Sequence, residues 1–142
     1  MIQILSGIQN TTAALEAERT RLDVISENIA NLNTTRGPDG KPYQRQVVVF
    51  ESALQQAVGS DNQDQTPTLR VSRIEKDPRP AELVYDPGHP DADAQGMVAM
   101  PNINIHEEMA DMIAASRAFE ANLAVVKNAR TMALQTLSIG KH

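Results

Sequence analysis

The first candidate for chemistry in this sequence is an acidic turn at residues 91–96, whose side chains could bind a metal. Like an EF-hand calcium loop, it has acidic residues at its first and third positions, Asp91 and Asp93, and a glycine, Gly96, at its sixth. Such a loop also needs a bidentate glutamate at its twelfth position, where this chain has Asn102, and a helix before it, which is not expected here. A polar turn therefore explains these acids better than calcium binding does.

A second candidate for chemistry is His106-Glu107, which begins like the helix of a zinc protease. That motif needs a second histidine four residues after the first, and the residue there is Ala110. The remaining histidines are scattered, and no Ser-His-Asp set or phosphate loop is indicated. The sequence therefore predicts no catalytic residues, no metal site and no cofactor. A small metal-dependent enzyme using Asp91 and Asp93 stays as a weaker alternative, which metal analysis of the purified protein would test.

Composition excludes further classes of function. The chain has 142 residues, a net charge of −5 and no cysteine. The charge leaves no basic patch for nucleic acid, and no apolar run approaches the length of a membrane span. A cleaved signal peptide is not expected, because Met1–Leu15 has no basic residue and no continuous apolar core.

Both ends of the chain carry heptad patterns that predict long helices, and these helices would position the middle of the chain. In the N-terminal segment, apolar residues recur every seven positions and predict a helix over about residues 3–31; they are Ile8, Leu15, Leu22 and Ile29. In the C-terminal segment, spacings of four and three define a longer seam, formed by Ile105, Met109, Met112, Phe119, Leu123, Val126 and Leu137 and interrupted by Ser116 and Arg130.

The C-terminal helix is expected to begin after Asn104, a capping residue, with Glu107 completing a capping box. It carries more apolar surface than one stripe, so it should be buried against several neighbours. A chain this short cannot easily provide them all, and we expect some to belong to other subunits. For the polar residue Arg130 we expect an acidic partner on a neighbouring helix, with Glu18 as a candidate.

All eight prolines lie in the middle of the chain, which divides it into three parts. These are an N-terminal coiled-coil helix and turn (1–36), a β-rich module (37–101) and a C-terminal coiled-coil helix (102–142). A turn is expected at 37–40 and a mobile loop at 51–67, and strands are expected at 43–50, 69–74, 82–85 and 97–100. The predicted fold is mainly α, with long terminal helices paired as a coiled coil around a small β-rich insertion.

Two short segments are more distinctive than the heptads. The first ends the N-terminal helix and contains Ser26, Asn28, Ile29, Ala30 and Asn31, followed by Thr34; the second lies in the C-terminal helix and contains Ser116, Arg117, Phe119, Glu120, Ala121 and Asn122. From local chemistry alone, the asparagines indicate only that a helix stops and turns. Together, however, the segments resemble the two signatures of the bacterial flagellar rod, hook and hook-filament axial proteins.

The resemblance covers nearly the whole chain, with residues 51–80 matching loosely. Segments 37–43, 83–96 and 100–103 resemble the short proximal-rod members in particular, although Phe119 stands where the family more often has tyrosine. The resemblance implies a structural subunit of the proximal rod that polymerises helically into a hollow, torque-transmitting shaft through which export substrates pass. Ser116, inside the second signature, would then be a close-packing position.

The same resemblance implies partners and a location. The partners would be further copies of the chain, other rod proteins, the MS ring and export gate side of the basal body, and the flagellar type III export apparatus. The location would be the rod in the periplasmic space, reached without a cleaved signal peptide. The main alternative is a non-flagellar coiled-coil adaptor or binding module, because a hydrophobic seam alone fits both.

Overall fold

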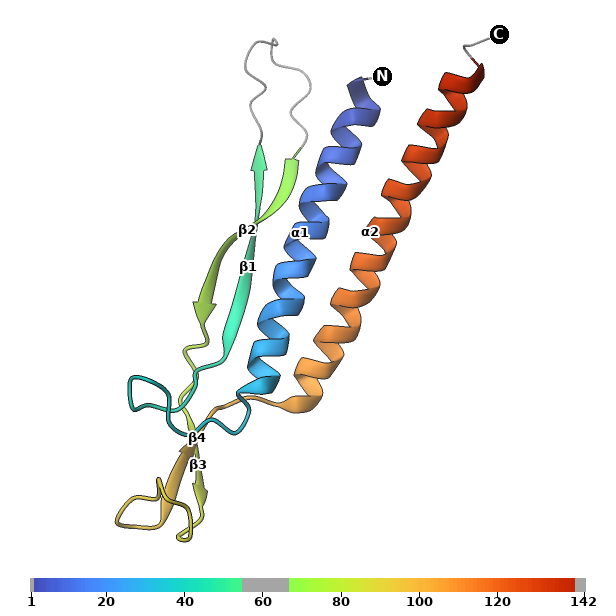
Figure 1. The fold of residues 1–142 in the computed structure, drawn as a ribbon. Helices are drawn as coiled ribbons and strands as arrows, with labels where there is room; N and C mark the ends of the chain where they lie inside the picture. The colour runs from blue at the N-terminus through green and yellow to red at the C-terminus, as the bar shows by residue number, and fades with distance from the viewer. Residues whose placement is uncertain (1, 55–66, 140–142) are drawn as a thin grey trace.

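The protein is described from a computed structural model that covers residues 2–54 and 67–139 (Figure 1). The elements in chain order are α1 (Ile2–Ala30), β1 (Gln46–Leu54), β2 (Pro67–Lys76), β3 (Glu82–Tyr85), β4 (Met97–Met100) and α2 (Ile105–Ile139). The predicted fold class is confirmed, with two long terminal helices and a small β-rich insertion between them.

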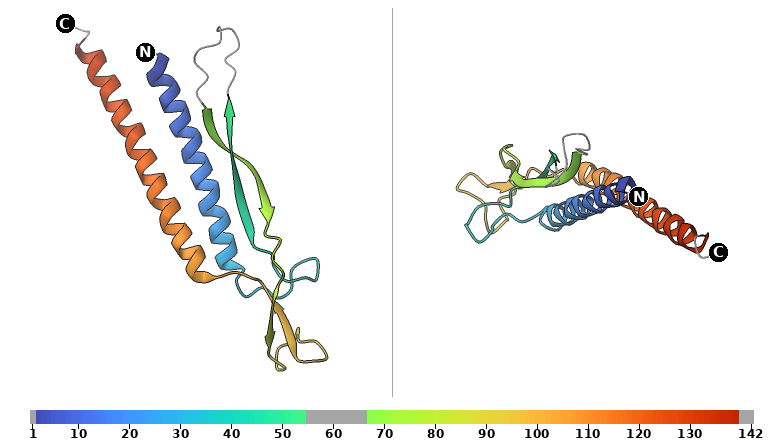
Figure 2. Two further views of the ribbon diagram at one scale, coloured as in Figure 1. Left: turned by 180° about the vertical axis from the view of Figure 1, so that it is seen from behind. Right: turned by 90° about the horizontal axis from the view of Figure 1, so that it is seen from above.

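The two helices run antiparallel and side by side. They are closest where α1 ends and α2 begins, and they diverge toward the chain termini (Figures 1 and 2). The predicted cap of α2 is confirmed, because Asn104 Oδ1 accepts the backbone N–H of His106 at 2.9 Å. The rest of the capping box is wrong: the Glu107 side chain is exposed and has no hydrogen-bond partner among the described residues.

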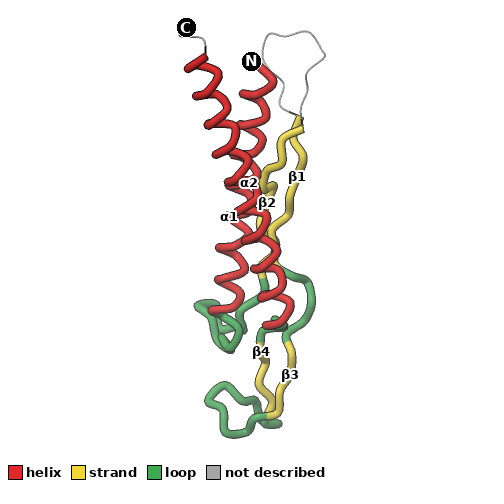
Figure 3. The backbone as a smooth tube through the Cα atoms, turned by 90° about the vertical axis from the view of Figure 1, so that its right-hand side faces the viewer, coloured by secondary structure: helices red, strands yellow, loops and turns green. Residues whose placement is uncertain are grey.

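The longer hairpin, β1–β2, lies along α1 (Figure 3). The strands are antiparallel, from Gln46 opposite Lys76 to Leu54 opposite Pro67, with a bulge after Val49. This corrects two expectations. The first strand begins at residue 46 rather than 43, and the mobile loop predicted for 51–67 is wrong at 51–54 and 67, which are strand. Its remaining part, 55–66, lies outside the described residues.

The shorter hairpin, β3–β4, matches the predicted strands at 82–85 and 97–100. It extends away from the helices at the end opposite the chain termini (Figure 1). The turn predicted at 37–40 and the polar turn predicted at 91–96 are confirmed, with Gly40 N–H donating to Gly37 O and Gly96 N–H to Asp93 O, each at 3.0 Å. Gly40 and Gly96 have φ angles of 74° and 79°. Positive φ is the conformation that glycine adopts without steric cost.

The apolar core is small. Among the described residues the buried apolar side chains are Ala17, Val24, Ile25, Val98 and Ala115, together with Pro101. Three polar or charged side chains, Asn28, Asp77 and Glu108, are buried beside them. Buried polar groups destabilise a fold unless they are hydrogen-bonded, so the partners of these three residues decide what holds the helices and the β module together.

Candidate functional site

The junction between the helices and the β module is built around Asn28. This residue is in the last turns of α1 and is 1% exposed. Its Nδ2 donates to the backbone oxygen of Gln46 at 2.9 Å and to Glu108 Oε2 at 3.1 Å. Its Oδ1 accepts the N–H of Gln46 at 2.9 Å and the hydroxyl of Tyr43 at 3.1 Å. The amide thus uses both donors and both acceptor positions, which no other side chain of this size could match.

Glu108 connects this junction to α2. Its side chain is 0% exposed, and Oε1 accepts a hydrogen bond from Arg45 Nε at 2.6 Å. A buried carboxylate requires such compensation, since an unpaired charge in a protein interior is strongly destabilising. Arg45 also lies 3.4 Å from Asp77 and 3.9 Å from Asp111. One guanidinium therefore joins the start of β1, the end of β2 and the first turns of α2.

The pKa values of Arg45 and Tyr43 are both raised by their surroundings in the junction. Burial alone would lower the pKa of Arg45, but the hydrogen bond and attraction of Glu108, with a further hydrogen bond to Asp77, outweigh it and raise that pKa. Burial also raises the pKa of Tyr43, helped by the charges of Glu27 and Glu108. A raised pKa keeps the Tyr43 hydroxyl protonated, as donation to Asn28 requires.

Asp77 closes the junction after β2. Both carboxylate oxygens accept hydrogen bonds from the Arg79 side chain, Oδ1 at 3.1 Å and Oδ2 at 2.8 Å. These bonds, first from the side chain and then from the backbone of Arg79, lower the pKa of Asp77 from 3.8 to about 2. Its backbone N–H donates to the oxygen of Arg45 at 2.8 Å, and its oxygen accepts from Gln44 Nε2 at 2.7 Å. We call Asn28, Tyr43, Arg45, Gln46, Asp77 and Glu108 the junction network.

Beside the junction network, Arg21 of α1 lies 3.5 Å from Asp111 of α2. Arg21 is also 3.8 Å from Glu18, one turn earlier on α1. Within the chain, the expected pairing of Glu18 with Arg130 is therefore wrong. On α2, Asp111 lies near the beginning of the helix and Arg130 lies in its C-terminal part, beyond the region that meets Arg21 and Glu18.

The N-terminal signature turns out to be part of the structural junction. Asn28 is its centre, and Asn31 Oδ1 accepts the hydroxyl of Thr34 at 3.1 Å. The backbone oxygen of Thr34 accepts the N–H of Tyr43 at 3.0 Å, which aims Tyr43 back at Asn28. Ser26 and Ala30 are exposed, and Ile29 is half-buried.

The C-terminal signature differs in character, since much of it faces outward. Arg117, Glu120 and Ala121 are exposed, whereas Ser116, Phe119 and Asn122 are half-buried. Ser116 follows Ala115, which is 0% exposed and lies on the face of α2 toward the rest of the chain. The two signatures are therefore not brought together into one site: one fixes the fold, and the other presents a surface.

The predicted seams are only partly covered within one chain. In α1, the heptad residues Ile8, Leu15, Leu22 and Ile29 are all half-buried, while the deepest positions are Ala17, Val24, Ile25 and Asn28. In α2, the seam residues that are half-buried are Ile105, Met112, Phe119, Leu123 and Val126. Met109 and Leu137 are 52% and 68% exposed.

Further large apolar side chains of α2 are open to solvent outside the seam. They are Ile113, Val125, Met132, Leu134 and Ile139, each more than half exposed. From residue 131 to 139 every residue of the helix is exposed, and this is where α2 has diverged from α1 (Figure 2). Exposed apolar side chains in this number on one helix are typical of a protein interaction site.

The acidic side chains of the turn at residues 91–96 have hydrogen-bond and ion-pair partners nearby in the chain. Asp91 accepts the hydroxyl of Thr35 at 2.8 Å and lies 3.7 Å from Arg36. Asp93 Oδ1 accepts the backbone N–H groups of Gln95 and Met97 at 2.8 and 2.9 Å. Within the part of the chain that the structure describes, no three His, Asp or Glu side chains are grouped as a metal ion would require.

Comparison with known proteins gives consistent matches along the chain. Residues 8–38 match the family model for flagella basal body rod proteins, and residues 94–139 match that for the C-terminal region of the flagellar basal body rod FlgEFG proteins. The flagellar basal-body rod protein FlgC of Borreliella burgdorferi is 43% identical, over 96% of this chain and 97% of its own length. FlgC of Yersinia enterocolitica is 41% identical over 91% and 92%, and FlgC of Bacillus subtilis 36% over 92% and 94%. No described helix has the length and apolarity needed to cross a membrane.

Proposed function

The chain belongs to the FlgC family of flagellar basal-body rod proteins, and from that premise we propose that its copies polymerise helically into a hollow, torque-transmitting shaft. The protein is a structural subunit of the basal-body rod and not an enzyme. In the proposed shaft, export substrates pass along the central channel. Family membership favours this function over a non-flagellar coiled-coil adaptor, for which the same heptads would suffice.

The observation that carries the proposal is the exposed apolar surface of α2. The side chains that would be buried on assembly are Met109, Ile113, Val125, Met132, Leu134, Leu137 and Ile139, which are 52–76% exposed in a single chain. Burying a fully exposed side chain of this size contributes about 1.5–3 kcal/mol. Because these side chains are already partly covered, each adds only part of that amount, and several together on each helix face are needed to hold subunits together. The half-buried heptad of α1 offers a second face of the same kind.

The divergence of the helices supports the same proposal. On α2, Leu137 lies on the continuation of the stripe that holds Phe119 and Val126 near α1, yet it is 68% exposed. A helix from a neighbouring subunit would fit against this stripe where α1 has moved away. The outward side chains of the C-terminal signature, Arg117, Glu120 and Ala121, would then contact neighbours as well.

The three-part division of the chain has a matching role in this arrangement. Segments 1–36 and 102–142 would line the tube, and the module of residues 37–101 would lie outside it. The junction network supports this division, because it fixes the β module to the helices at one end of the pair. The β1–β2 hairpin covers one side of α1, whereas α2 contacts only α1 among the described elements and keeps its other sides for neighbours.

The finer location and partners are part of the proposal. The rod would stand in the periplasmic space, with its base toward the MS ring and the export gate. The subunit would reach it through the flagellar type III export apparatus without a cleaved signal peptide. What supports these points is membership of the rod family.

Deleting the gene and examining isolated basal bodies by electron microscopy tests the function. We expect rings without a rod, and a complementing copy should restore the rod and swimming. Normal basal bodies in the deletion strain would contradict the function. Export is tested separately, by detecting the full-length chain outside the cytoplasm in a strain with an intact export apparatus and its absence there when the apparatus is disabled.

A further inference from the structure

The β module is divided into a basic part and an acidic part. Residues 36–54 and 67–81, which form the β1–β2 hairpin and its flanking segments, contain seven basic and four acidic residues. Residues 82–100, which form the β3–β4 hairpin, contain four acidic and no basic residues. Asp91 of the acidic part already pairs with Arg36 of the basic part within the chain, at 3.7 Å.

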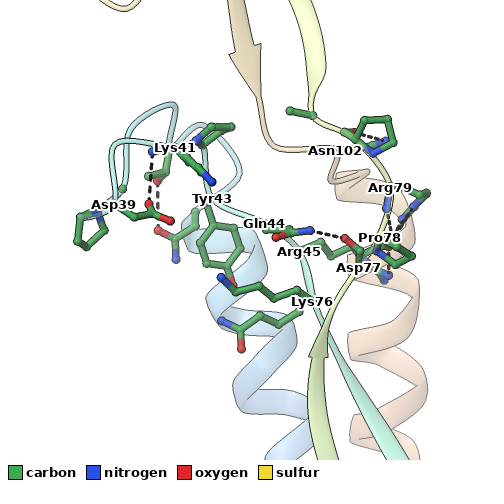
Figure 4. A pocket seen from close by; sticks show the side chains of 18 residues that line it. Asp39, Lys41, Tyr43, Gln44, Arg45, Lys76, Asp77, Pro78, Arg79 and Asn102 are labelled. Atoms are coloured by element: carbon green, nitrogen blue, oxygen red, sulfur yellow. Dashed lines mark hydrogen bonds and ion pairs between the residues drawn. The ribbon is translucent and has the colours of Figure 1, made fainter.

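The basic part contains a groove of about 540 Å³. One wall is the turn before β1, with Lys41, Pro42 and Tyr43, and the other is the segment from the end of β2, with Lys76, Pro78 and Pro80 (Figure 4). Lys41 and Lys76 are exposed and form no ion pair within the described residues. Two acids also line the groove: Asp77 is paired with Arg79 and Arg45, and Asp39 Oδ1 accepts the backbone N–H of Lys41 at 3.3 Å. The lining still has more basic than acidic side chains.

The acidic hairpin has an exposed surface that complements this groove. All four residues of β3 are exposed, with Leu83 at 64% and Tyr85 at 69%. Glu82 and Asp86 stand at the two ends of the strand. A two-stranded hairpin is marginal in water without further packing, and a tyrosine flanked by an apolar residue is typical of an interface anchor.

The hairpin does not fill the groove of its own chain. The groove is lined by Ala81, just before β3, and by Asn102, just after β4, and the hairpin between these two residues leads away from it (Figures 1 and 4). Groove and hairpin are thus both open in one copy. A heterologous contact between these two surfaces, repeated from copy to copy, builds a ring or an open helical filament.

We propose that the β3–β4 hairpin of one copy docks in the Lys41–Lys76 groove of a neighbouring copy. Leu83 and Tyr85 contact the prolines and Tyr43, while Glu82 and Asp86 face Lys41 and Lys76. This contact rests on the proposed polymerisation and adds an outer connection between subunits to the one formed by the helices. The charges supply specificity, and the apolar side chains supply the contact area.

The chain has no cysteine, which allows a direct test by cross-linking. Two differently tagged chains are expressed together, one carrying Leu83→Cys in the hairpin and the other Pro80→Cys in the groove, and basal bodies are isolated and oxidised. Since a disulfide needs Cα atoms within about 7 Å, the mixed-tag dimer reports the proposed contact. The control pairs Leu83→Cys with Ser72→Cys, an exposed position on β2 outside the groove.

Charge reversal makes the test specific. Adding K41E and K76E to the groove chain should abolish the mixed dimer, and adding E82K and D86K to the hairpin chain should restore it. Basal bodies that contain rods but give no mixed dimer, or as much with Ser72→Cys as with Pro80→Cys, would overturn the contact alone. A chain missing from the basal bodies altogether would instead overturn the proposed function.

Discussion

The side-chain amide of Asn28 binds both backbone groups of Gln46, with the N–H and the C=O each 2.9 Å away. A helix side chain thus takes the place of a neighbouring strand at the start of β1. Through Glu108 the same amide also reaches α2. This one residue therefore connects the first helix, the β module and the last helix.

Replacing Asn28 should destabilise the whole junction. Asn28→Leu keeps a branched side chain but leaves the backbone groups of Gln46 and the Oε2 atom of Glu108 without the partner that Asn28 provides, while Glu108 Oε1 keeps Arg45. We expect a loss of about 2–4 kcal/mol in the free energy of unfolding, measured by denaturant titration with circular dichroism. Asn33→Leu, at an exposed position of the following turn, is the matched control and should change stability by less than about 0.5 kcal/mol. Equal effects would contradict the role of the Asn28 amide.

The ion pair of Arg45 and Glu108 should appear as a strong coupling. Arg45→Met leaves the buried carboxylate of Glu108 without its ion-pair partner and should cost about 3 kcal/mol or more. Glu108→Leu should cost less, because Arg45 keeps Asp77 at 3.4 Å and Asp111 at 3.9 Å. The double variant should cost much less than the sum of the two. Additive losses in this double-mutant cycle would show that the 2.6 Å contact does not couple the residues.

Acid stability should depend on Asp77. Its pKa is about 2 in the folded chain and 3.8 ordinarily, so between these values the unfolded chain binds more protons. Stability therefore rises with pH across this window, is complete above about pH 4 and is lost as pH falls toward 2. Asp77→Asn should flatten the Tm profile between pH 2 and 4. Arg79→Ala, which removes the first cause of the shift, should flatten it too; unchanged slopes in both variants would contradict the assignment.

Two glycines with positive φ should differ in their tolerance of a side chain. A Cβ at Gly96 would be 2.9 Å from Tyr85 Cε2 and 3.1 Å from Pro87 Cβ, whereas at Gly40 it would meet nothing within 4 Å. Gly40→Ala should cost about 1–2 kcal/mol for backbone strain alone. Gly96→Ala should cost more and expose the β3–β4 hairpin to protease. Limited proteolysis with matched unfolding curves measures both; equal costs would exclude the clash with Tyr85.

The periodic parts of the fold could be predicted from the sequence. The heptads predicted both helices, and the prolines and glycines of the middle segment led to β3 and β4 at their observed residues. The start of β1 was predicted too early. Tyr43 and Arg45 look like strand residues, but their side chains and backbone are used by Asn28, Glu108 and Asp77 in the junction network.

The junction network itself could not be predicted from one chain. Asn28 had the appearance of a helix-ending residue, and Glu108 that of an ordinary acid at a helix N-terminus. Their contact spans 80 residues, and only the antiparallel arrangement of the helices brings them together. The assembly seams stay predictions, because their partners would belong to other subunits.

The central claim is that the exposed apolar face of α2 is an assembly surface, and Leu137 tests it most directly. Because this side chain is 68% exposed, Leu137→Asp should leave the circular dichroism and unfolding of the isolated chain unchanged. Leu137→Met, which keeps the position apolar, is the control. Electron microscopy of basal bodies from strains carrying only one of these variants should find rings without rods for Leu137→Asp and complete rods for Leu137→Met. Complete rods and normal swimming with Leu137→Asp would contradict the account.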